Sequence, residues 1–241
     1  MHKPGVYPAG KKLSIRHGLF LTLVLLFVLA GFFACSDSSS SAGSPPVSQQ
    51  KTDLGFDTIA AVGDSLTAGY GVDEEQAYPA LLEKRLLRDG YFIRVVNAGI
   101  SGETSSGVLS RIEWVVGSLK PEIVILETGA NDGLRGVDPT LIQENIDRVV
   151  TILRENGIDV LLAGMRMPPN LGLDYTTRFA SLYAKIADKH GIPLIPFFLK
   201  SVAGDRRYIL SDGIHPNAQV YRLILEDLYP YVLDVLKREK G

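Results

Sequence analysis

The sequence predicts an α/β fold, a three-layer α/β/α sandwich around a five-stranded, mainly parallel sheet. Short apolar runs alternate with helix-length amphipathic segments from residue 56 onward, which is the order that successive β-α units produce. The apolar runs are rich in leucine or β-branched residues, as is typical of strands buried on both faces of a parallel sheet. Glycines follow three of the helical segments, where a left-handed backbone conformation commonly ends a helix.

Each element follows from its own local pattern. The five expected strands are the apolar runs at 58–62, 92–97, 122–127, 159–164 and 193–197. The five expected helices are the amphipathic segments at 77–89, 104–118, 139–156, 175–190 and 218–237. Gly90, Gly157 and Gly191 mark the ends of the first, third and fourth helices, and Pro139 suits the first turn of the third. Right-handed crossovers connect such strands, so we expect one domain over residues 55–241.

The first 34 residues predict an export signal. Lys11, Lys12 and Arg16 precede an uncharged apolar run at 18–34, the arrangement of a secretory signal peptide. The run is also near the lower length limit for a membrane span, so an uncleaved signal anchor is the alternative.

Cys35 directly follows this apolar run, with Ala34 before it and a Ser-rich segment after it. This arrangement resembles a bacterial lipoprotein signal, in which the cysteine is lipidated and becomes the first residue of the mature protein; an incidental thiol is the alternative. Residues 35–54 are poor in apolar side chains, which predicts a flexible tether. The resemblance implies an exported protein at the periplasmic face of a bacterial membrane, and Ser36 favours the outer membrane if the cell is Gram-negative.

Composition excludes several classes of function. A net charge of −2 gives no basic surface for nucleic acid. The single cysteine permits neither an intramolecular disulfide nor a cysteine-rich metal site. Because His, Asp and Glu show no clustered ligand spacing either, we expect no metal and no other cofactor. The oligomeric state does not follow from the sequence.

Three polar motifs follow predicted strands, and a fourth precedes the last helix. They are Gly-Asp-Ser-Leu at 63–66, Asn-Ala-Gly at 97–99, Gly-Ala-Asn-Asp at 129–132 and Asp-Gly-Ile-His-Pro at 212–216. The carboxyl ends of parallel strands meet at one edge of the sheet, where open α/β folds place their ligand sites. The first three motifs therefore predict one polar site at that edge, and the fourth would have to fold back over it.

A serine hydroxyl needs a base within hydrogen-bond reach to act as a nucleophile. His215 is the candidate base for Ser65, because His190, the only other histidine of the folded body, lies at a predicted helix end. Asp212, three residues before His215, can orient the imidazole. Asp64 is adjacent to Ser65 in the chain and is interpreted as a structural hydrogen-bonding residue.

Over most of residues 57–236 the sequence resembles the SGNH hydrolase superfamily, also called the GDSL esterase/lipase family. The resemblance rests on four motif blocks in order, at 63–66, 97–104, 129–136 and 212–216. Within the superfamily the chain is similar to the bacterial thioesterase I, lysophospholipase and arylesterase group, through the extended third block and the loop at 166–172. Ala130 stands where this group often has glycine, and Glu103 where aspartate is common. The resemblance implies the flavodoxin-like SGNH hydrolase fold.

The resemblance also implies the roles of five residues. Ser65, Asp212 and His215 would form the catalytic triad of a serine esterase that hydrolyses acyl esters through an acyl-serine intermediate. The oxyanion hole would consist of the backbone N–H of Ser65, the backbone N–H of Gly102 and the side-chain amide of Asn131. Such a reaction requires no metal.

The substrate is less sharply defined by the sequence. Leu66, Leu134, Met167 and Pro168 are expected to border an acyl-binding groove, with ordinary core packing as the alternative. An exported enzyme rarely meets acyl-CoA, so lysophospholipids or small and aryl esters are the expected substrates, with possible thioesterase activity. Two other functions are open: a polysaccharide O-deacetylase of the same superfamily, and a non-enzymatic module that holds a phosphate at a helix N-terminus. The phosphate module lacks the Gly-rich spacing and the lysine of a P-loop.

Overall fold

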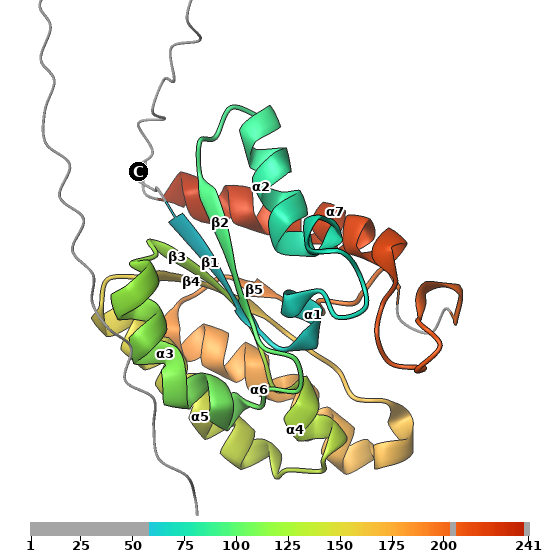
Figure 1. Cartoon of the computed structure of the whole chain (residues 1–241). Helices are drawn as coiled ribbons and strands as arrows, with labels where there is room; N and C mark the ends of the chain where they lie inside the picture. The colour runs from blue at the N-terminus through green and yellow to red at the C-terminus, as the bar shows by residue number, and fades with distance from the viewer. Residues whose placement is uncertain (1–57, 203–205, 239–241) are drawn as a thin grey trace, which may run out of the picture. The chain divides into compact units, whose positions relative to one another are not determined.

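The computed structural model describes residues 58–202 and 206–238 (Figure 1). The predicted signal at 1–34, Cys35 and the tether at 35–54 lie outside the described residues. Five strands form one sheet in the order β2-β1-β3-β4-β5, and every neighbouring pair is parallel. The strands are β1 (Thr58–Gly63), β2 (Arg94–Gly99), β3 (Ile123–Glu127), β4 (Asp159–Ala163) and β5 (Leu194–Ile195). The predicted fold class is therefore confirmed, with a wholly parallel sheet.

Helices cover both faces of the sheet and complete the three layers (Figure 1). One face carries α3 (Ser105–Leu119), α5 (Pro139–Glu155) and α6 (Leu173–His190); the other carries α2 (Tyr78–Arg88) and α7 (Ala218–Arg238). Two short helices, α1 (Ser65–Ala68) and α4 (Ala130–Leu134), directly follow β1 and β3. Three 3-10 turns lie in the connections: η1 (Glu74–Gln76), η2 (Pro169–Leu171) and η3 (Arg206–Tyr208).

Local sequence explains where the helices begin and end. The Thr104 side chain caps α3, and the Asp138 side chain caps α5 by accepting a backbone N–H of the first turn. Gly90, Gly157 and Gly191 have positive φ at the ends of α2, α5 and α6, as the sequence predicts.

β5 is shorter than predicted, and β2 is shifted along the chain by two residues, from 92–97 to Arg94–Gly99. β5 pairs with β4 over only two residues, because Pro193 and Pro196 on either side have no N–H to continue the ladder. β2 runs further than expected, to Gly99, which pairs with Gly63 at the end of β1. This pairing brings the second motif alongside the first at the carboxyl edge of the sheet.

The central strands form the core. β3 is buried at all five positions, and β1 and β4 are buried after their first residue. Burying each large aliphatic side chain contributes about 1.5–3 kcal/mol, so this layer fixes the sheet edge on which the motifs lie.

Within 58–202 and 206–238, none of the helices combines the length and hydropathy that a bilayer-spanning segment needs.

Candidate active site

Ser65 lies at the carboxyl end of β1, where the chain turns directly into α1. Asp64 caps this short helix, because its Oδ1 accepts the Leu66 N–H at 2.9 Å. The turn is pressed closely against β3: a Cβ on Gly63 would lie 2.5 Å from the carbonyl oxygen of Glu127. These contacts fix the position of the Ser65 side chain at the sheet edge.

His215 approaches Ser65 from the segment that precedes α7. Its Nε2 lies 2.9 Å from the Ser65 Oγ, and its Nδ1 lies 2.7 Å from the Asp212 Oδ2. With its proton on Nδ1, the imidazole donates to Asp212, and its Nε2 accepts from the serine hydroxyl. A general base needs that tautomer. The structure thus brings together the three residues that the sequence predicts as a triad.

The backbone around Asp212 keeps its side chain ionised. The Asp212 Oδ1 accepts the N–H groups of His215 at 3.0 Å and Ile214 at 2.9 Å. These two bonds, together with the bond to the His215 ring, lower the pKa of Asp212 to about 2. The intervening Gly213 has a φ of 76°, a conformation that glycine adopts without strain. Asp212 is therefore a carboxylate at neutral pH and can orient the imidazole.

Further contacts hold His215 in place. The Leu210 N–H donates to the His215 carbonyl at 2.7 Å, and Ile209 and Pro216 form an antiparallel bridge. The Tyr70 ring lies against the imidazole, with the ring centroids 4.4 Å apart. Sequence reasoning missed Tyr70, because the contact joins segments far apart in the chain and no local pattern marks it.

The three predicted oxyanion donors come from three elements that Asn131 connects. The N–H groups of Ser65 and Gly102 donate no hydrogen bond to another described residue. Gly102 has a φ of 79°, and nothing lies within 4 Å of its Cβ position. The Asn131 Nδ2 lies 3.0 Å from both the Asp64 Oδ2 and the Glu103 carbonyl. Its amide therefore joins the nucleophile turn to the Gly102 loop, and an oxyanion would have to share one of its hydrogens.

An ion pair supports the Gly102 loop. Arg111 on α3 donates to both Glu103 carboxylate oxygens, at 2.7 and 2.6 Å, and to the Ala98 carbonyl at 2.8 Å. Arg135 donates to the Gly102 carbonyl at 3.1 Å. Glu103, which departs from the family pattern, thus has a specific partner. Arg111 could not be identified from sequence, because a helical pattern does not show which charged residue turns back to a loop.

A second buried network anchors the third motif. The Asp132 carboxylate accepts the Ser105 hydroxyl at 2.6 Å and the Ser105 N–H at 2.8 Å. The Ser105 Oγ in turn accepts the Asn145 side-chain amide at 3.0 Å. These bonds tie α4 to α3 and α5, and so hold the element that carries Asn131.

The predicted groove residues lie in different environments. Leu66 is buried in the core. Leu134 is half-exposed at the end of α4, Met167 is partly buried and Pro168 is exposed. The Met167 sulfur packs against Gly133, where a Cβ would lie 2.3 Å from it. Leu134, Met167 and Pro168 therefore remain candidates for a surface groove.

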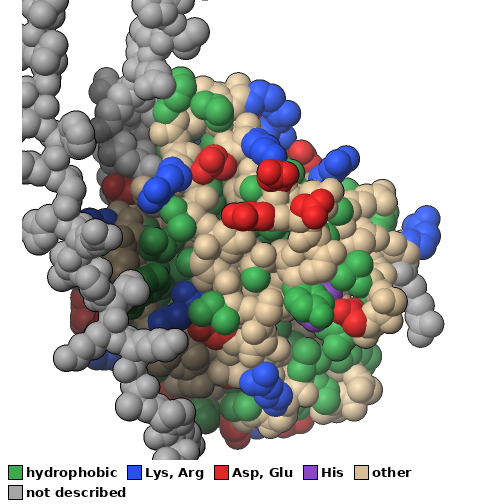
Figure 2. All heavy atoms as spheres, viewed as in Figure 1, with side chains coloured by type: hydrophobic (Ala, Val, Ile, Leu, Met, Phe, Trp, Pro, Cys, Tyr) green, Lys and Arg blue, Asp and Glu red, His purple; other side chains and the backbone are tan. Residues whose placement is uncertain are grey.

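Exposed apolar side chains also belong to the motif segments or lie close to them in the chain. They are Ile100, Leu134 and Ile214 within the motifs and Tyr70 four residues after the first motif, each about half exposed. In the space-filling view, hydrophobic side chains gather where a histidine reaches this face of the molecule (Figure 2). The predicted triad thus lies beside apolar surface.

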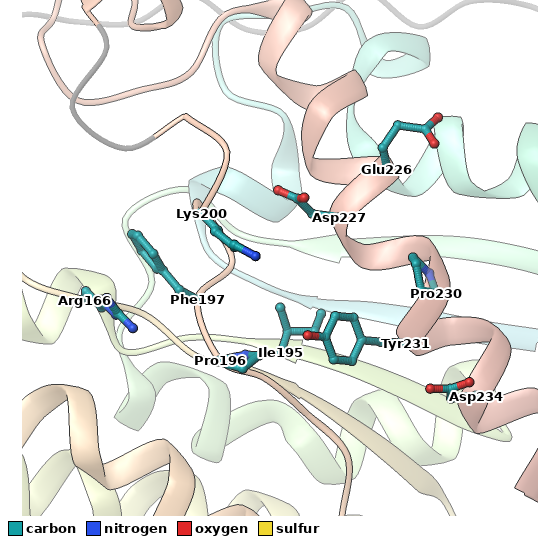
Figure 3. A pocket seen from close by; sticks show the side chains of 10 residues that line it. All are labelled: Arg166, Ile195, Pro196, Phe197, Lys200, Glu226, Asp227, Pro230, Tyr231 and Asp234. Atoms are coloured by element: carbon teal, nitrogen blue, oxygen red, sulfur yellow. The ribbon is translucent and has the colours of Figure 1, made fainter.

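A hollow of about 720 Å³ lies elsewhere, between α7 and the segment after β5 (Figure 3). Its lining includes Arg166, Lys200, Asp227 and Tyr231, and none of the triad or oxyanion residues. His190 pairs with Asp147 at 2.8 Å on the α5–α6 surface. Residues 58–202 and 206–238 hold no cluster of three His, Cys, Asp or Glu side chains arranged to bind a metal ion.

Comparison with known proteins gives a consistent result. Residues 61–223 match the model of the GDSL-like Lipase/Acylhydrolase family. Esterase TesA of Pseudomonas aeruginosa is 41% identical over 74% of this chain and 89% of its own length. Arylesterase of Vibrio mimicus is 36% identical over 70% and 84%. Thioesterase 1/protease 1/lysophospholipase L1 of Escherichia coli K12 is 34% identical over 76% and 83%.

A solved structure agrees with these relatives. The crystal structure of AlinE4, an SGNH-hydrolase family esterase, superposes with a TM-score of 0.64 at 40% identity. The alignment covers 75% of this chain and 97% of AlinE4.

Proposed function

Because the chain belongs to the GDSL-like lipase/acylhydrolase family and is a serine esterase of the SGNH type, we propose that Ser65 is its nucleophile, His215 its general base and Asp212 the residue that orients His215. The observation that carries this proposal is the continuous chain of hydrogen bonds from Ser65 to His215 to Asp212, at 2.9 and 2.7 Å. No other pair of described histidine and serine side chains forms such a chain with a carboxylate.

Acylation begins when the Ser65 Oγ attacks the carbonyl carbon of the ester and its proton passes to the His215 Nε2. The electron pair of the carbonyl moves onto its oxygen. The N–H groups of Ser65 and Gly102 and the amide of Asn131 stabilise this oxyanion. Asp212 stabilises the imidazolium that forms. When the tetrahedral intermediate collapses, the carbon–oxygen bond to the alcohol breaks, and His215 donates its proton to the leaving alcohol.

Deacylation repeats these steps with water. His215 accepts a proton from the water as its oxygen attacks the acyl carbon, and the same donors hold the second oxyanion. Breaking the bond to the Ser65 Oγ returns the proton from His215 to the serine and releases the carboxylic acid. A thioester would follow the same course with a thiol as the leaving group.

The nucleophile assignment is tested with Ser65→Ala in the full chain, and Ser110→Ala serves as the matched control because Ser110 is an exposed serine on α3. We expect p-nitrophenyl acetate hydrolysis to fall by at least about 10³-fold in the first variant and to be unchanged in the second. A fluorophosphonate should add its mass to the wild type and to Ser110→Ala only. Equal hydrolysis by the wild type and Ser65→Ala would reject the assignment.

We propose lysophospholipids and small or aryl esters as the substrate class. The support is the apolar surface around a polar site: Ile100, Leu134 and Ile214 belong to the motif segments and expose about half of their side chains. A series from p-nitrophenyl acetate to palmitate, with lysophosphatidylcholine and an acyl thioester, measures the preference. Higher kcat/KM on acetylated xylan than on every acyl ester in the series would favour the O-deacetylase alternative.

We also propose that the enzyme is exported and anchored through lipidated Cys35, because an apolar run and a small residue precede this cysteine. Growing cells with labelled palmitate should label the wild type and leave Cys35→Ser unlabelled. Label that survives in Cys35→Ser would reject the lipoprotein assignment, while leaving the signal-anchor alternative open to a fractionation experiment.

A further inference from the structure

Glu127, the last residue of β3, is a fully buried carboxyl group that the reaction steps above do not use. Burying a carboxyl group among apolar side chains is costly unless hydrogen bonds compensate. The hydrogen bonds of Glu127 all go to the turn that carries Ser65. The Glu127 Oε2 accepts the Asp64 N–H at 3.3 Å and the Thr67 hydroxyl at 3.0 Å, so its partners lie on both sides of Ser65.

The nucleophile turn is built directly onto this carboxyl group. A Cβ at Gly63 would lie 2.7 Å from the Glu127 Oε2 and 2.2 Å from the Thr67 Oγ1. Only glycine allows the turn to approach β3 this closely. The glycine of the first motif therefore serves the contact with Glu127 as well as the turn itself.

Asp64 connects Glu127 to the proposed oxyanion donors. Its backbone N–H is bound by Glu127, while its Oδ1 accepts the Leu66 N–H and lies 3.5 Å from the Ser65 Oγ. Its Oδ2 accepts the Asn131 amide at 3.0 Å. Asp64 thus positions two of the three proposed oxyanion donors, at Ser65 and Asn131, and Glu127 in turn positions Asp64.

We propose that Glu127 is a positioning residue for the esterase reaction: as a neutral carboxylic acid it fixes Asp64 and Thr67, and through them the oxyanion donors of Ser65 and Asn131. This inference rests on the proposed function. The neutral form is required because a second negative charge beside that of Asp64, at the turn that carries Ser65, would oppose the developing oxyanion.

The surroundings of Glu127 favour the neutral acid. The ionisable groups that act on it or share its site are Asp64 on the nucleophile turn, Tyr78 on α2, Tyr183 on α6, Tyr221 on α7 and, through Asp64, His215. Among described residues, the carboxyl groups of Glu127 and Asp64 form no ion pair with lysine or arginine.

The proton therefore belongs on Glu127 and the charge on Asp64. Burial, and then the neighbouring charge of Asp64, raise the pKa of Glu127 well above its usual range. The Asp64 carboxylate accepts one donor on each oxygen, from the Leu66 N–H and the Asn131 amide, which stabilises its charged form. Both donors to Glu127 bind its Oε2. The Glu127 Oε1 has no hydrogen-bond partner among described residues, so ionisation would leave an unpaired anionic oxygen in the core.

The test compares Glu127→Gln and Glu127→Ala in the full chain. Glu122→Ala is the matched control, because Glu122 also accepts a β1 backbone N–H, from Thr58 at 2.8 Å, but at the far end of β3. We expect Glu127→Ala to lower kcat on p-nitrophenyl butyrate by at least about tenfold, with KM changed by less than about threefold. Glu127→Gln, a neutral isostere, and Glu122→Ala should keep kcat within about threefold.

A second measurement does not depend on catalysis or on Glu127→Ala folding. In a Ser65→Ala background, the folding equilibrium constant is measured in urea at several pH values with Glu127 and with Glu127→Gln. A carboxyl with a raised pKa keeps a proton in the folded state that the unfolded chain releases, so stability is full at low pH and falls as pH rises. Relative to Glu127→Gln, the parent should lose up to about tenfold in this constant per pH unit above the ordinary glutamate range.

Each result points one way. Normal kcat in Glu127→Ala, equal loss in Glu127→Gln and Glu127→Ala, or parallel pH dependence with and without Glu127 would overturn the inference. Full activity of Ser65→Ala would instead reject the proposed function, and the urea experiment would still report the protonation state of Glu127.

Discussion

Replacing Asn131 by alanine separates a role in catalysis from a role in stability. Removing one oxyanion donor lowers kcat by about 10²–10³-fold, or roughly 2.7–4 kcal/mol. The structure adds a second effect, because the Asn131 amide also donates to Asp64, whose side chain is only 1% exposed. Leaving a buried carboxylate oxygen without that donor costs about 1–3 kcal/mol of folding stability. We therefore expect Asn131→Ala to lose both activity and stability.

Asn156→Ala is the matched control for this variant. Asn156 lies at the C-terminal end of α5, away from the four motifs, and its amide donates to the Ile152 carbonyl at 2.8 Å. Losing this neutral hydrogen bond should cost about 0.5–1.5 kcal/mol without touching the oxyanion site. Urea unfolding measures the stability of both variants, and steady-state hydrolysis of p-nitrophenyl butyrate measures kcat and KM.

The expected signature is a large fall in kcat in Asn131→Ala alone, with KM little changed. If both variants lost stability and neither lost more than about threefold in kcat, Asn131 would be a structural link and not an oxyanion donor. If both lost kcat equally, the loss would reflect a weakened fold, and the assignment would also fail.

Three further predictions follow from the same contacts. Gly63→Ala should lower stability by about 1–3 kcal/mol and abolish hydrolysis, because the added Cβ meets a β3 carbonyl at 2.5 Å. Its control is Gly117→Ala, at an exposed position in α3 with open space around the Cβ, which should gain about 0.5–1 kcal/mol of stability in urea unfolding. Asp212→Asn should lower kcat by about 10⁴-fold at every pH between about 5 and 8. The pKa of about 2 keeps Asp212 charged throughout this range, and the stabilising effect of the charge is lost only as pH falls through about 2. A full rate of Asp212→Asn anywhere in this range would contradict the assignment. Arg111→Met should lower stability by about 3–5 kcal/mol in urea unfolding by leaving Glu103 unpaired, and Arg111→Met combined with Glu103→Gln should recover much of the loss.

The proposed triad could be identified from sequence because its members lie in short motifs whose places relative to the strands could be inferred. Ser65 follows an apolar strand, and parallel strands end at one edge. Asp212 and His215 are three residues apart, so their contact is almost local. Residues whose roles depend on neighbours remote in sequence were not accessible. Arg111 reads as one more charged residue on a helix, and only the folded chain shows that it binds Glu103.

Glu127 illustrates the same limit within a strand. In sequence it is one charged residue at the end of an apolar run, and no local pattern marks it as part of the site, whereas the structure buries it completely. The short helix α4 was also missed, because its five residues cannot display a period of 3.6. The length of β5 was overestimated, although Pro193 and Pro196 were visible as residues that interrupt a ladder.

The proposed base and its orienting carboxylate lie together on one irregular segment, whereas the proposed nucleophile and oxyanion donors lie at the sheet edge. This segment is closed by the Leu210 to His215 hydrogen bond and the Ile209–Pro216 bridge, not by the core. We therefore expect this segment to unfold locally before the sheet does. Mild denaturant should stop turnover while the amides of β3 still resist hydrogen exchange, and the Leu210 amide should exchange at the concentration where activity is lost.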